Sequence, residues 1–325
     1  MYFNRIFLLV TDACDSRCTL CDYWLTKNPK FIDSDFVEEK VASFIKENGV
    51  SVVCISGGEP SLHPDLGKIV RSVRRAGATA TLTTSTTRLE TRFEEIRDLV
   101  THYMISLDGA DRETYRGSRG IDLFDHAVGW IRRLRVETSA DLAISCVLQA
   151  CNIASIRLIY ELAIELQVNR IFFRVPDFKP HSFGRSGLTR SKTLKQVEVT
   201  PSEASALAAD LEWIIKADEK HKLLGQSSGN LRRKAQFFQC VSENADYEEE
   251  DQLCDVPLTS LVIHADGTCR PCFYLPQVQP FNRAPLEGSA FLDVHSRMLN
   301  DKDFRKQWCN ACQQFDGHKH LIERL

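Results

Sequence analysis

The chain has 325 residues, of which 43% are hydrophobic and 26% charged, with a formal net charge of −3. This balance is typical of a globular chain with a substantial core, and it excludes a disordered or collagen-like protein. The slight excess of acidic residues gives no electrostatic reason to bind nucleic acid or an anionic membrane. We therefore expect a small-molecule or peptide substrate and no membrane, and nucleic acid is the less favoured partner.

Short apolar runs alternate with segments of helical period along the first half of the chain, which is the signature of βα units. The predicted strands are Arg5–Val10, Ser51–Ile55, Thr79–Thr83, His102–Leu107, Asp141–Leu148 and Asn169–Arg174. The predicted helices between them include Asp35–Glu47, Leu62–Ala76 and Ile153–Leu166. Consecutive βα units of this kind predict an α/β fold, either a partial (β/α)6 TIM-like barrel or a doubly wound sheet.

The alternating pattern ends near Pro176, and a polar linker or lid follows. Thr200 and Glu203 form a capping box for a helix that we expect to run to about His221, and a polar loop with an acidic run comes next. The C-terminal part contains a predicted hairpin, Ser260–His264 with Thr268–Cys272. We expect a barrel at 1–180, a linker and bridging helix at 181–245, and a small α+β domain at 246–325.

The cysteine content is the unusual feature of the composition, since the chain has 12 cysteines. The apolar run at the start is too short for a signal peptide, and no apolar run reaches the roughly 18 residues that span a bilayer. The sequence therefore predicts a cytoplasmic protein. In a reducing compartment, clustered cysteines are more often metal ligands or reactive thiols than disulfides.

Cys14, Cys18 and Cys21 form a CxxxCxxC triplet directly after the first predicted strand. Parallel α/β barrels place their active sites in the loops at this end of the strands. Three thiolates can hold three corners of an iron–sulfur cube and leave the fourth iron open to another ligand. The alternative is a zinc site completed by a neighbouring aspartate, although structural zinc more often uses spaced pairs of Cys or His.

The second predicted strand is followed by a GGEP segment made of Gly57, Gly58, Glu59 and Pro60. The triplet and this segment, at the ends of consecutive strands, resemble the radical S-adenosylmethionine (SAM) enzyme superfamily. The resemblance implies that the triplet ligates a [4Fe-4S] cluster whose open iron binds SAM, and that reductive cleavage of SAM yields a 5′-deoxyadenosyl radical. It also implies that backbone groups of the GGEP segment bind the SAM amine, where glycine permits close approach of a ligand.

The resemblance continues through the later strands of the predicted barrel. Thr84 and Ser85 follow the third strand and are expected to contact the SAM ribose. Ser106 and Asp108 belong to an SLDG segment that is frequent in the superfamily after the fourth strand. Arg119 matches the basic position that meets the SAM carboxylate, and its guanidinium fork suits a carboxylate.

A second cysteine group resembles the Twitch domain, the shorter of the SPASM/Twitch-type extensions in the same superfamily. Its members are Cys254, Cys272, Cys309 and Cys312. The resemblance implies a second, auxiliary [4Fe-4S] cluster with four thiolate ligands and no open iron. Two alternatives remain: Cys269 replaces Cys254 as a ligand, or the two CxxC pairs that begin at Cys269 and Cys309 bind structural zinc.

The remaining cysteines fall into two classes. Cys54, Cys146 and Cys151 lie in or beside predicted strands, and we expect them to behave as small hydrophobes. Cys240 lies in the polar stretch between the barrel and the second cysteine group. Certain epimerases of the superfamily are thought to quench the substrate radical with a hydrogen atom from a cysteine, which would make Cys240 catalytic. The alternative is that Cys240 has no function.

The resemblance implies an enzyme that abstracts a hydrogen atom from a substrate C–H bond. The outcome would be epimerisation or oxidation, the latter by dehydrogenation or crosslinking, of a natural-product peptide or an aminoglycoside-like substrate. A reductant such as flavodoxin or ferredoxin would supply the electron. The alternatives are an RNA-modifying radical SAM enzyme, which usually carries a basic stripe, and a non-enzymatic metal-binding scaffold, which leaves the GGEP segment unexplained.

Overall fold

The computed structural model describes residues 3–176, 195–245, 254, 256–275, 279–281 and 289–308. The strands in these ranges form one sheet in the order β6-β5-β4-β3-β2-β1-β7-β8-β9. They are β1 Arg5–Thr11, β2 Val52–Gly57, β3 Thr79–Thr84, β4 His102–Ser106, β5 Asp141–Val147, β6 Arg170–Arg174, β7 Ser260–Ile263, β8 Thr268–Arg270 and β9 Gln279–Pro280. All six strands predicted for the first half of the chain are confirmed, with ends that differ by a residue or two.

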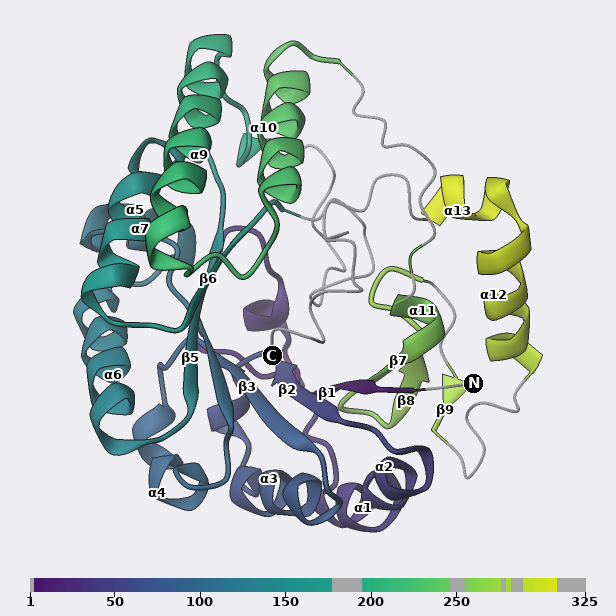
Figure 1. Cartoon of the computed structure of the whole chain (residues 1–325). Helices are drawn as coiled ribbons and strands as arrows, with labels where there is room; N and C mark the ends of the chain where they lie inside the picture. Colours follow the sequence, from purple (N-terminus) through teal and green to yellow (C-terminus); the bar gives the residue numbers. More distant parts are fainter. Residues whose placement is uncertain are drawn as a thin grey trace.

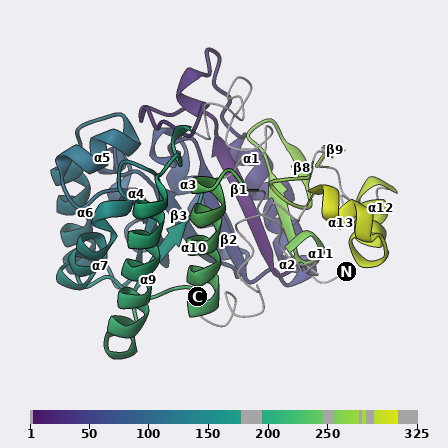
Figure 2. The same cartoon turned by 90° about the horizontal axis from the view of Figure 1, so that it is seen from above.

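Helices connect the strands and cover the outer side of the sheet (Figure 1). The first half contains α1 Ser34–Phe36, a π-helical stretch Val37–Val41, α2 Ala42–Asn48, α3 Leu66–Arg75, α4 Phe93–Ile96, α5 Arg112–Arg119, α6 Phe124–Glu137 and α7 Ile156–Glu165. The later part contains α9 Pro201–His221, α10 Ser228–Ser242, α11 Val256–Thr259, α12 Ser289–Asn300 and α13 Lys302–Trp308. In both views α12 and α13 lie at the opposite end of the molecule from α6 and α7 (Figures 1 and 2).

The strand order decides between the two predicted architectures. Strands β1 to β6 follow one another in sequence order and are parallel. A doubly wound sheet reverses its strand order at a switch point, whereas an unbroken order places every crossover helix on one side, as in a barrel. The fold is therefore mixed α/β, with a parallel sheet and outer helices arranged as a partial TIM-type barrel.

Side chains alternate between the two faces of each strand, so each strand has a core face and an inner face. In β1, Ile6, Leu8 and Val10 are fully buried in the core that includes the helices. The residues between them, such as Arg5 and Phe7, belong to the inner face, and we call the space enclosed by the inner faces the lumen. The lumen face is more polar than the core face, because β2 to β5 place Ser, Thr, His and Asp side chains there.

The C-terminal hairpin continues the barrel sheet. The predicted pairing is confirmed, since Val262 of β7 lies opposite Arg270 of β8 in an antiparallel ladder. Strand β7 also pairs in parallel with β1, from Arg5 opposite Ser260 to Leu8 opposite Ile263. One edge of the barrel is thus covered by residues about 250 positions further along the chain. At the other edge, Leu224 forms a single parallel bridge with Ile171 of β6.

Helices α9 and α10 pack against each other beyond β6 (Figure 1). The capping box is confirmed, because Thr200 Oγ1 accepts a hydrogen bond from Glu203 N at 3.2 Å and the Glu203 carboxylate accepts one from Thr200 N at 2.7 Å. The expected polar loop after α9 is wrong for residues 228–242, which form α10. Ser227 caps this helix, and Leu231 and Phe238 are fully buried.

Some predicted features lie outside the described residues, namely the acidic run, most of the linker, Cys309 and Cys312. Among the described helices, none is both long and apolar enough to cross a membrane.

Candidate active site

The cysteine loop, residues 12–22, leaves the carboxyl end of β1 and lies against the GGEP segment. Gly58 N donates a hydrogen bond to Thr11 O at 2.7 Å, and Glu59 N donates one to Ala13 O at 2.8 Å. A Cβ atom on Gly57 would lie 2.1 Å from Thr11 O, and one on Gly58 would lie 2.0 Å from Ala13 O. The glycines therefore permit close approach of the protein's own backbone, a reason different from the ligand contact that the sequence suggested.

The other side of the cysteine loop is held by the end of α5. Arg17 N donates a hydrogen bond to Arg119 O at 3.1 Å, and Thr19 N donates one to Ser118 O at 3.1 Å. Gly120 ends α5 in the left-handed region, with φ of +69°, and a Cβ atom there would lie 2.1 Å from Arg17 O. Backbone contacts on two sides therefore fix the loop that presents the three cysteines.

The three thiols are partly buried and influence one another electrostatically. Burial is the main cause that raises the pKa of Cys14 to about 11 and of Cys21 to about 12, and each is raised further by the charge of Cys18. Such thiols stay protonated unless a cation stabilises their thiolates, as a bound iron would. The described residues contain no three His, Cys, Asp or Glu side chains close enough for one metal ion. This does not conflict with an iron–sulfur cube, because the cysteine ligands of a cube bind different irons.

Glu59 is 1% exposed, and its carboxylate is surrounded by hydrogen-bond donors. Oε1 accepts from Ser61 N at 3.1 Å, Ser61 Oγ at 2.6 Å and Thr84 Oγ1 at 2.8 Å. Oε2 accepts from Ser85 N at 2.7 Å and Ser85 Oγ at 2.6 Å. Thr84 and Ser85 are both buried, so in this structure their hydroxyls tie the end of β3 to the GGEP segment. Their contact with a ribose stays a prediction.

Asp108 and Arg119 form a buried ion pair beside the cysteine loop. Arg119 Nη1 donates to Asp108 Oδ2 at 3.2 Å, and Val147 N donates to Asp108 Oδ1 at 2.6 Å. Burial raises the pKa of Asp108, while Arg119 opposes that rise. Arg119 Nε is buried and has no hydrogen-bond partner among the described residues. A buried guanidinium nitrogen without an acceptor fits a bound anion such as a SAM carboxylate.

Two polar residues after β5 support this arrangement and were missed in the sequence. Gln149 Oε1 accepts a hydrogen bond from Thr19 Oγ1 of the cysteine loop at 2.8 Å. Asn152 Nδ2 donates to Asp108 O at 2.9 Å. Their position directly after a predicted strand was the available signal, because that is where a barrel places its functional loops. Ser106, which the sequence did single out, ends β4 and is half-buried.

The packing of the later cysteines bears on the second predicted cluster. Cys272 belongs to a small apolar cluster at the C-terminal end of the described residues, and Cys254 packs against this cluster. Cys269 is fully buried in the main core, where burial raises its pKa to about 12. Of the two predicted alternatives, this packing favours Cys254 over Cys269 as the partner of Cys272.

The other cysteines have varied surroundings. Cys240 lies in the last turn of α10 and is half-buried, and its catalytic role stays a prediction. Cys146 is fully buried, as expected for a small hydrophobe. Cys151 is exposed, so that expectation is wrong for this residue, which lies in the turn after β5. Cys54 is half-buried on the lumen face of β2.

Residues 8–144 match the Radical SAM superfamily. The AdoMet-dependent heme synthase of Methanosarcina barkeri is 24% identical over 326 aligned positions, which cover 94% of this chain and 86% of the synthase. The GTP 3′,8-cyclase of Stenotrophomonas maltophilia is 32% identical over 126 residues. That match covers 37% of this chain and 38% of the cyclase, so the chain spans well under half of the cyclase's length.

Two solved structures share the fold. Streptococcus suis SuiB bound to precursor peptide SuiA superposes with a TM-score of 0.66 at 15% identity, covering 99% of this chain and 72% of SuiB. The protein anSMEcpe with bound AdoMet and Cp18Cys peptide superposes with a TM-score of 0.59 at 16% identity, covering 93% of this chain and 81% of anSMEcpe. At these identities the likeness is one of architecture.

A pH-dependent stability follows from the hairpin beside this site. Arg270 Nε donates to His264 Nε2 at 2.8 Å, so the imidazole must be neutral at that nitrogen. Burial, together with the charge of Arg270, lowers the pKa of His264 to about 4. The unfolded chain, with a pKa near 6.5, binds more protons between these values. The resulting stabilisation is complete above about pH 6.5 and is lost as the pH falls towards 4.

We expect the melting temperature to fall by several degrees from pH 7 to pH 5, which corresponds to about 2 kcal/mol. His264→Gln keeps an acceptor for Arg270 and removes the titration, so its melting temperature should depend less on pH. Thermal melting of both proteins across this range checks the prediction. Equal pH dependence in the two proteins would contradict it.

Proposed function

The chain carries a radical SAM domain at residues 8–144, and from this premise we propose that it is an enzyme that abstracts a hydrogen atom from a C–H bond of a peptide substrate. The cysteine loop is the observation that carries the proposal, because backbone contacts from two sides fix the loop that bears Cys14, Cys18 and Cys21. Near these thiols lies the buried Arg119, whose Nε has no hydrogen-bond partner in the part of the chain that the structure describes. This combination provides cluster ligands and an anion partner at the active-site end of a barrel.

The residues have distinct roles in this proposal. When bound, the cluster and SAM supply a 5′-deoxyadenosyl radical that removes the substrate hydrogen. Cys14, Cys18 and Cys21 hold the cluster, and Arg119 orients SAM through its carboxylate. The amide of Gly58 is already bonded to Thr11 at the end of β1, and that of Glu59 to Ala13 of the cysteine loop. Carbonyl oxygens of the GGEP segment are therefore the groups that would accept hydrogen bonds from the SAM amine.

The proposed substrate class rests on the structural neighbours. SuiB is bound to a precursor peptide, and anSMEcpe is bound to the Cp18Cys peptide. These neighbours favour a peptide over the aminoglycoside-like substrate that the sequence also suggested. We propose that Cys254 and Cys272, with Cys309 and Cys312, hold a second [4Fe-4S] cluster. An all-thiolate cluster suits electron transfer, with a flavodoxin or ferredoxin as the external reductant.

A second candidate function is a reaction of heme synthesis, with a heme precursor as the substrate. The alignment with the AdoMet-dependent heme synthase covers 94% of this chain, which is more than the barrel alone. Incubation of the reconstituted protein with SAM and a reductant, together with either a peptide library or an iron-loaded porphyrin precursor, separates the two. A mass change in the peptide supports the first candidate, and a change in porphyrin absorbance supports the second.

The first test of the proposed function is metal content. Two cubes correspond to about eight iron and eight sulfide per chain. Replacing the triplet Cys14, Cys18 and Cys21 with Ala should halve the iron and abolish SAM cleavage. Cys151→Ala, at an exposed cysteine, is the matched control and should change neither. Iron analysis and detection of 5′-deoxyadenosine check this, and SAM cleavage that survives in the triple variant would contradict the assignment.

The second test concerns Arg119. Arg119→Lys keeps a positive charge near Asp108 and removes the forked guanidinium group that suits a carboxylate. SAM should therefore bind at least ten-fold more weakly, because one charge-assisted hydrogen bond contributes roughly 1.5–3 kcal/mol. Equilibrium dialysis of labelled SAM measures the affinity, and unchanged iron content shows that the cluster is retained. Wild-type affinity with intact clusters would assign Arg119 only to the ion pair with Asp108.

The third test separates the two outcomes of hydrogen abstraction. Oxidation removes two hydrogens from the product, whereas epimerisation in heavy water leaves the product with one added deuterium. If the outcome is epimerisation, Cys240→Ala should still form 5′-deoxyadenosine and should lose inversion and deuterium uptake, because the thiol hydrogen exchanges with solvent. Mass spectrometry of the product checks this. An unchanged deuterated product from the variant would show that Cys240 is not the donor.

A further inference from the structure

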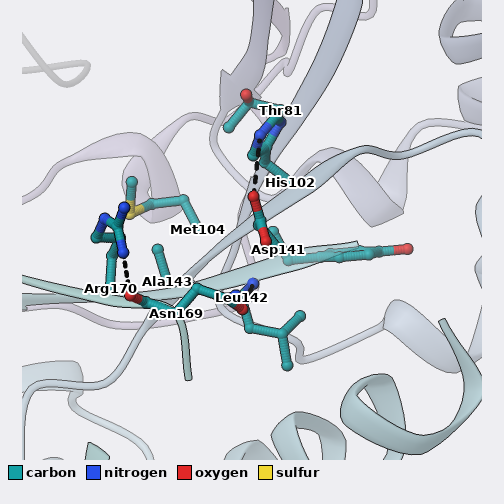
Figure 3. Close-up of a pocket in the computed structure, with 9 residues that line it drawn as sticks. Thr81, His102, Met104, Asp141, Leu142, Ala143, Asn169 and Arg170 are labelled. Carbon is teal, nitrogen blue, oxygen red and sulfur yellow. Dashed lines mark hydrogen bonds and ion pairs between the residues drawn. The ribbon is translucent and has the colours of Figure 1, made fainter. Parts of the chain in front are cut away.

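The inner face of strands β1 to β6 carries more positive than negative charge. Within β1 to β6, which the structure describes in full, the arginines are Arg5, Arg170 and Arg174, and the only carboxylate is Asp141. Asp141 lies 3.5 Å from His102 at the amino ends of the strands and is 57% exposed (Figure 3).

Arg5 is the most unusual of these arginines. It is 9% exposed, and its Nε and Nη2 atoms are buried without a hydrogen-bond partner among the described residues. Its guanidinium carbon lies 5.8 Å from the ring centroid of Phe7, two residues further along β1. The side chain thus extends towards the carboxyl end of the lumen. Buried guanidinium nitrogens are normally paired, because an unpaired buried charge is strongly destabilising.

Arg174 approaches from the other end. Its Nε donates to Ser145 Oγ on β5 at 3.1 Å, and its guanidinium lies 5.3 Å from the ring of Phe172, two residues back along β6. The side chain thus extends towards the amino end of the lumen. Burial raises the pKa of Cys54, in the middle of β2, and the charges of Arg5 and Arg174 both lower it. Both guanidinium groups therefore lie within electrostatic reach of one place in the lumen.

A third polar group lies next to that place. Thr81 of β3 is directly opposite Cys54 in the sheet, and its hydroxyl oxygen is buried without a partner among the described residues. It lines a cavity of about 70 Å³ at the amino end of the lumen (Figure 3). The other inner-face residues around this cavity are His102, Met104, Asp141, Ala143 and Arg170. A water molecule occupies about 30 Å³, so the cavity has room for a small polar group.

We propose that Arg5, Arg174 and the Thr81 hydroxyl form a carboxylate-binding subsite inside the barrel, and that the substrate enters the lumen with an anionic group. The inference deepens the proposed function and rests on it, because it takes the lumen to be the place where substrate binds. A guanidinium fork gives a carboxylate two parallel hydrogen bonds, and a hydroxyl adds a third donor. An acidic side chain or the C-terminus of a peptide meets this requirement.

The position of the subsite also limits the substrate. The strand β1 runs from Arg5 to Thr11 and covers roughly 20 Å at about 3.3 Å per residue. The cysteine loop begins at its carboxyl end, whereas Cys54, whose pKa is lowered by the charges of both arginines, lies about halfway along β2. The anionic group and the reacting carbon of the substrate should thus be separated by on the order of 10 Å, or several bonds.

The test uses the full chain, reconstituted with iron and sulfide and saturated with SAM, and glutarate as the probe. Calorimetry should show that glutarate binds and that the uncharged analogue glutaramide does not. Arg5→Gln and Arg174→Gln should each weaken glutarate binding at least ten-fold. Arg71→Gln, at an exposed arginine of α3, is the matched control and should leave binding unchanged.

A second variant keeps the test informative if Arg5→Gln folds poorly. Arg5→Met removes a buried charge for which the described residues offer Nε and Nη2 no hydrogen-bond partner, so without glutarate its melting temperature should equal or exceed that of the wild type. Glutarate should raise the melting temperature of the wild type and leave that of Arg5→Met unchanged.

The outcomes separate the subsite from the proposed function. Equal binding of glutarate and glutaramide, or unchanged binding after Arg5→Gln, would overturn the subsite and assign the orphan nitrogens to water. Phosphate binding more than ten-fold tighter than glutarate would overturn the carboxylate assignment in favour of a phosphate. Iron content and SAM cleavage are measured on the same samples. Arg5-dependent glutarate binding without iron or SAM cleavage would retain the subsite and reject the proposed radical chemistry.

Discussion

The site depends on one set of backbone contacts, the clamp that joins the GGEP segment to the end of β1 and the start of the cysteine loop. Two amides of the segment bond to carbonyls of Thr11 and Ala13, at a separation that leaves no room for a Cβ atom on Gly57 or Gly58. A loop with three cysteines has many conformations, and ordering each residue costs roughly 1–2 kcal/mol of backbone entropy. The clamp confines the loop before any ligand binds, which is the condition for a preorganised site.

Buried charged side chains connect the clamp to the neighbouring strands. Glu59 is withdrawn from solvent and receives donors from the GGEP segment and from the end of β3. A buried carboxylate destabilises the fold unless hydrogen-bond donors surround it, so the loss of one donor would lower the stability of the protein markedly. Asp108, after β4, and Arg119, at the end of α5, form a second buried charged contact of this kind. The strand ends around the proposed SAM site are therefore joined by hydrogen bonds and an ion pair that stabilise the fold.

The sequence predicted the barrel well, because strand alternation and helical period are local signals. It also singled out the cysteine triplet, the GGEP segment and Arg119, and the structure brings these segments into contact at one end of the barrel. It failed at α10, where a run of Arg and Lys hid the apolar face that Leu231 and Phe238 bury. It could not show that Thr84 and Ser85 bond to Glu59, nor that two nitrogens of Arg5 have no hydrogen-bond partner among the described residues, since these facts depend on contacts across strands. Motifs can be found in a sequence, whereas the surroundings of a buried arginine are visible only in three dimensions.

The parallel pairing of β7 with β1 has a consequence for shortened versions of the chain. Strand β1, which leads into the cysteine loop, pairs along one edge with residues 260–263 of β7. A protein that ends before β7 would expose the backbone donors and acceptors of an apolar, otherwise central strand. Such edges pair readily with other chains, and natural sheets avoid leaving them open. The barrel of this protein is therefore a poor candidate for isolation as a fragment, since the exposed edge of β1 would promote aggregation.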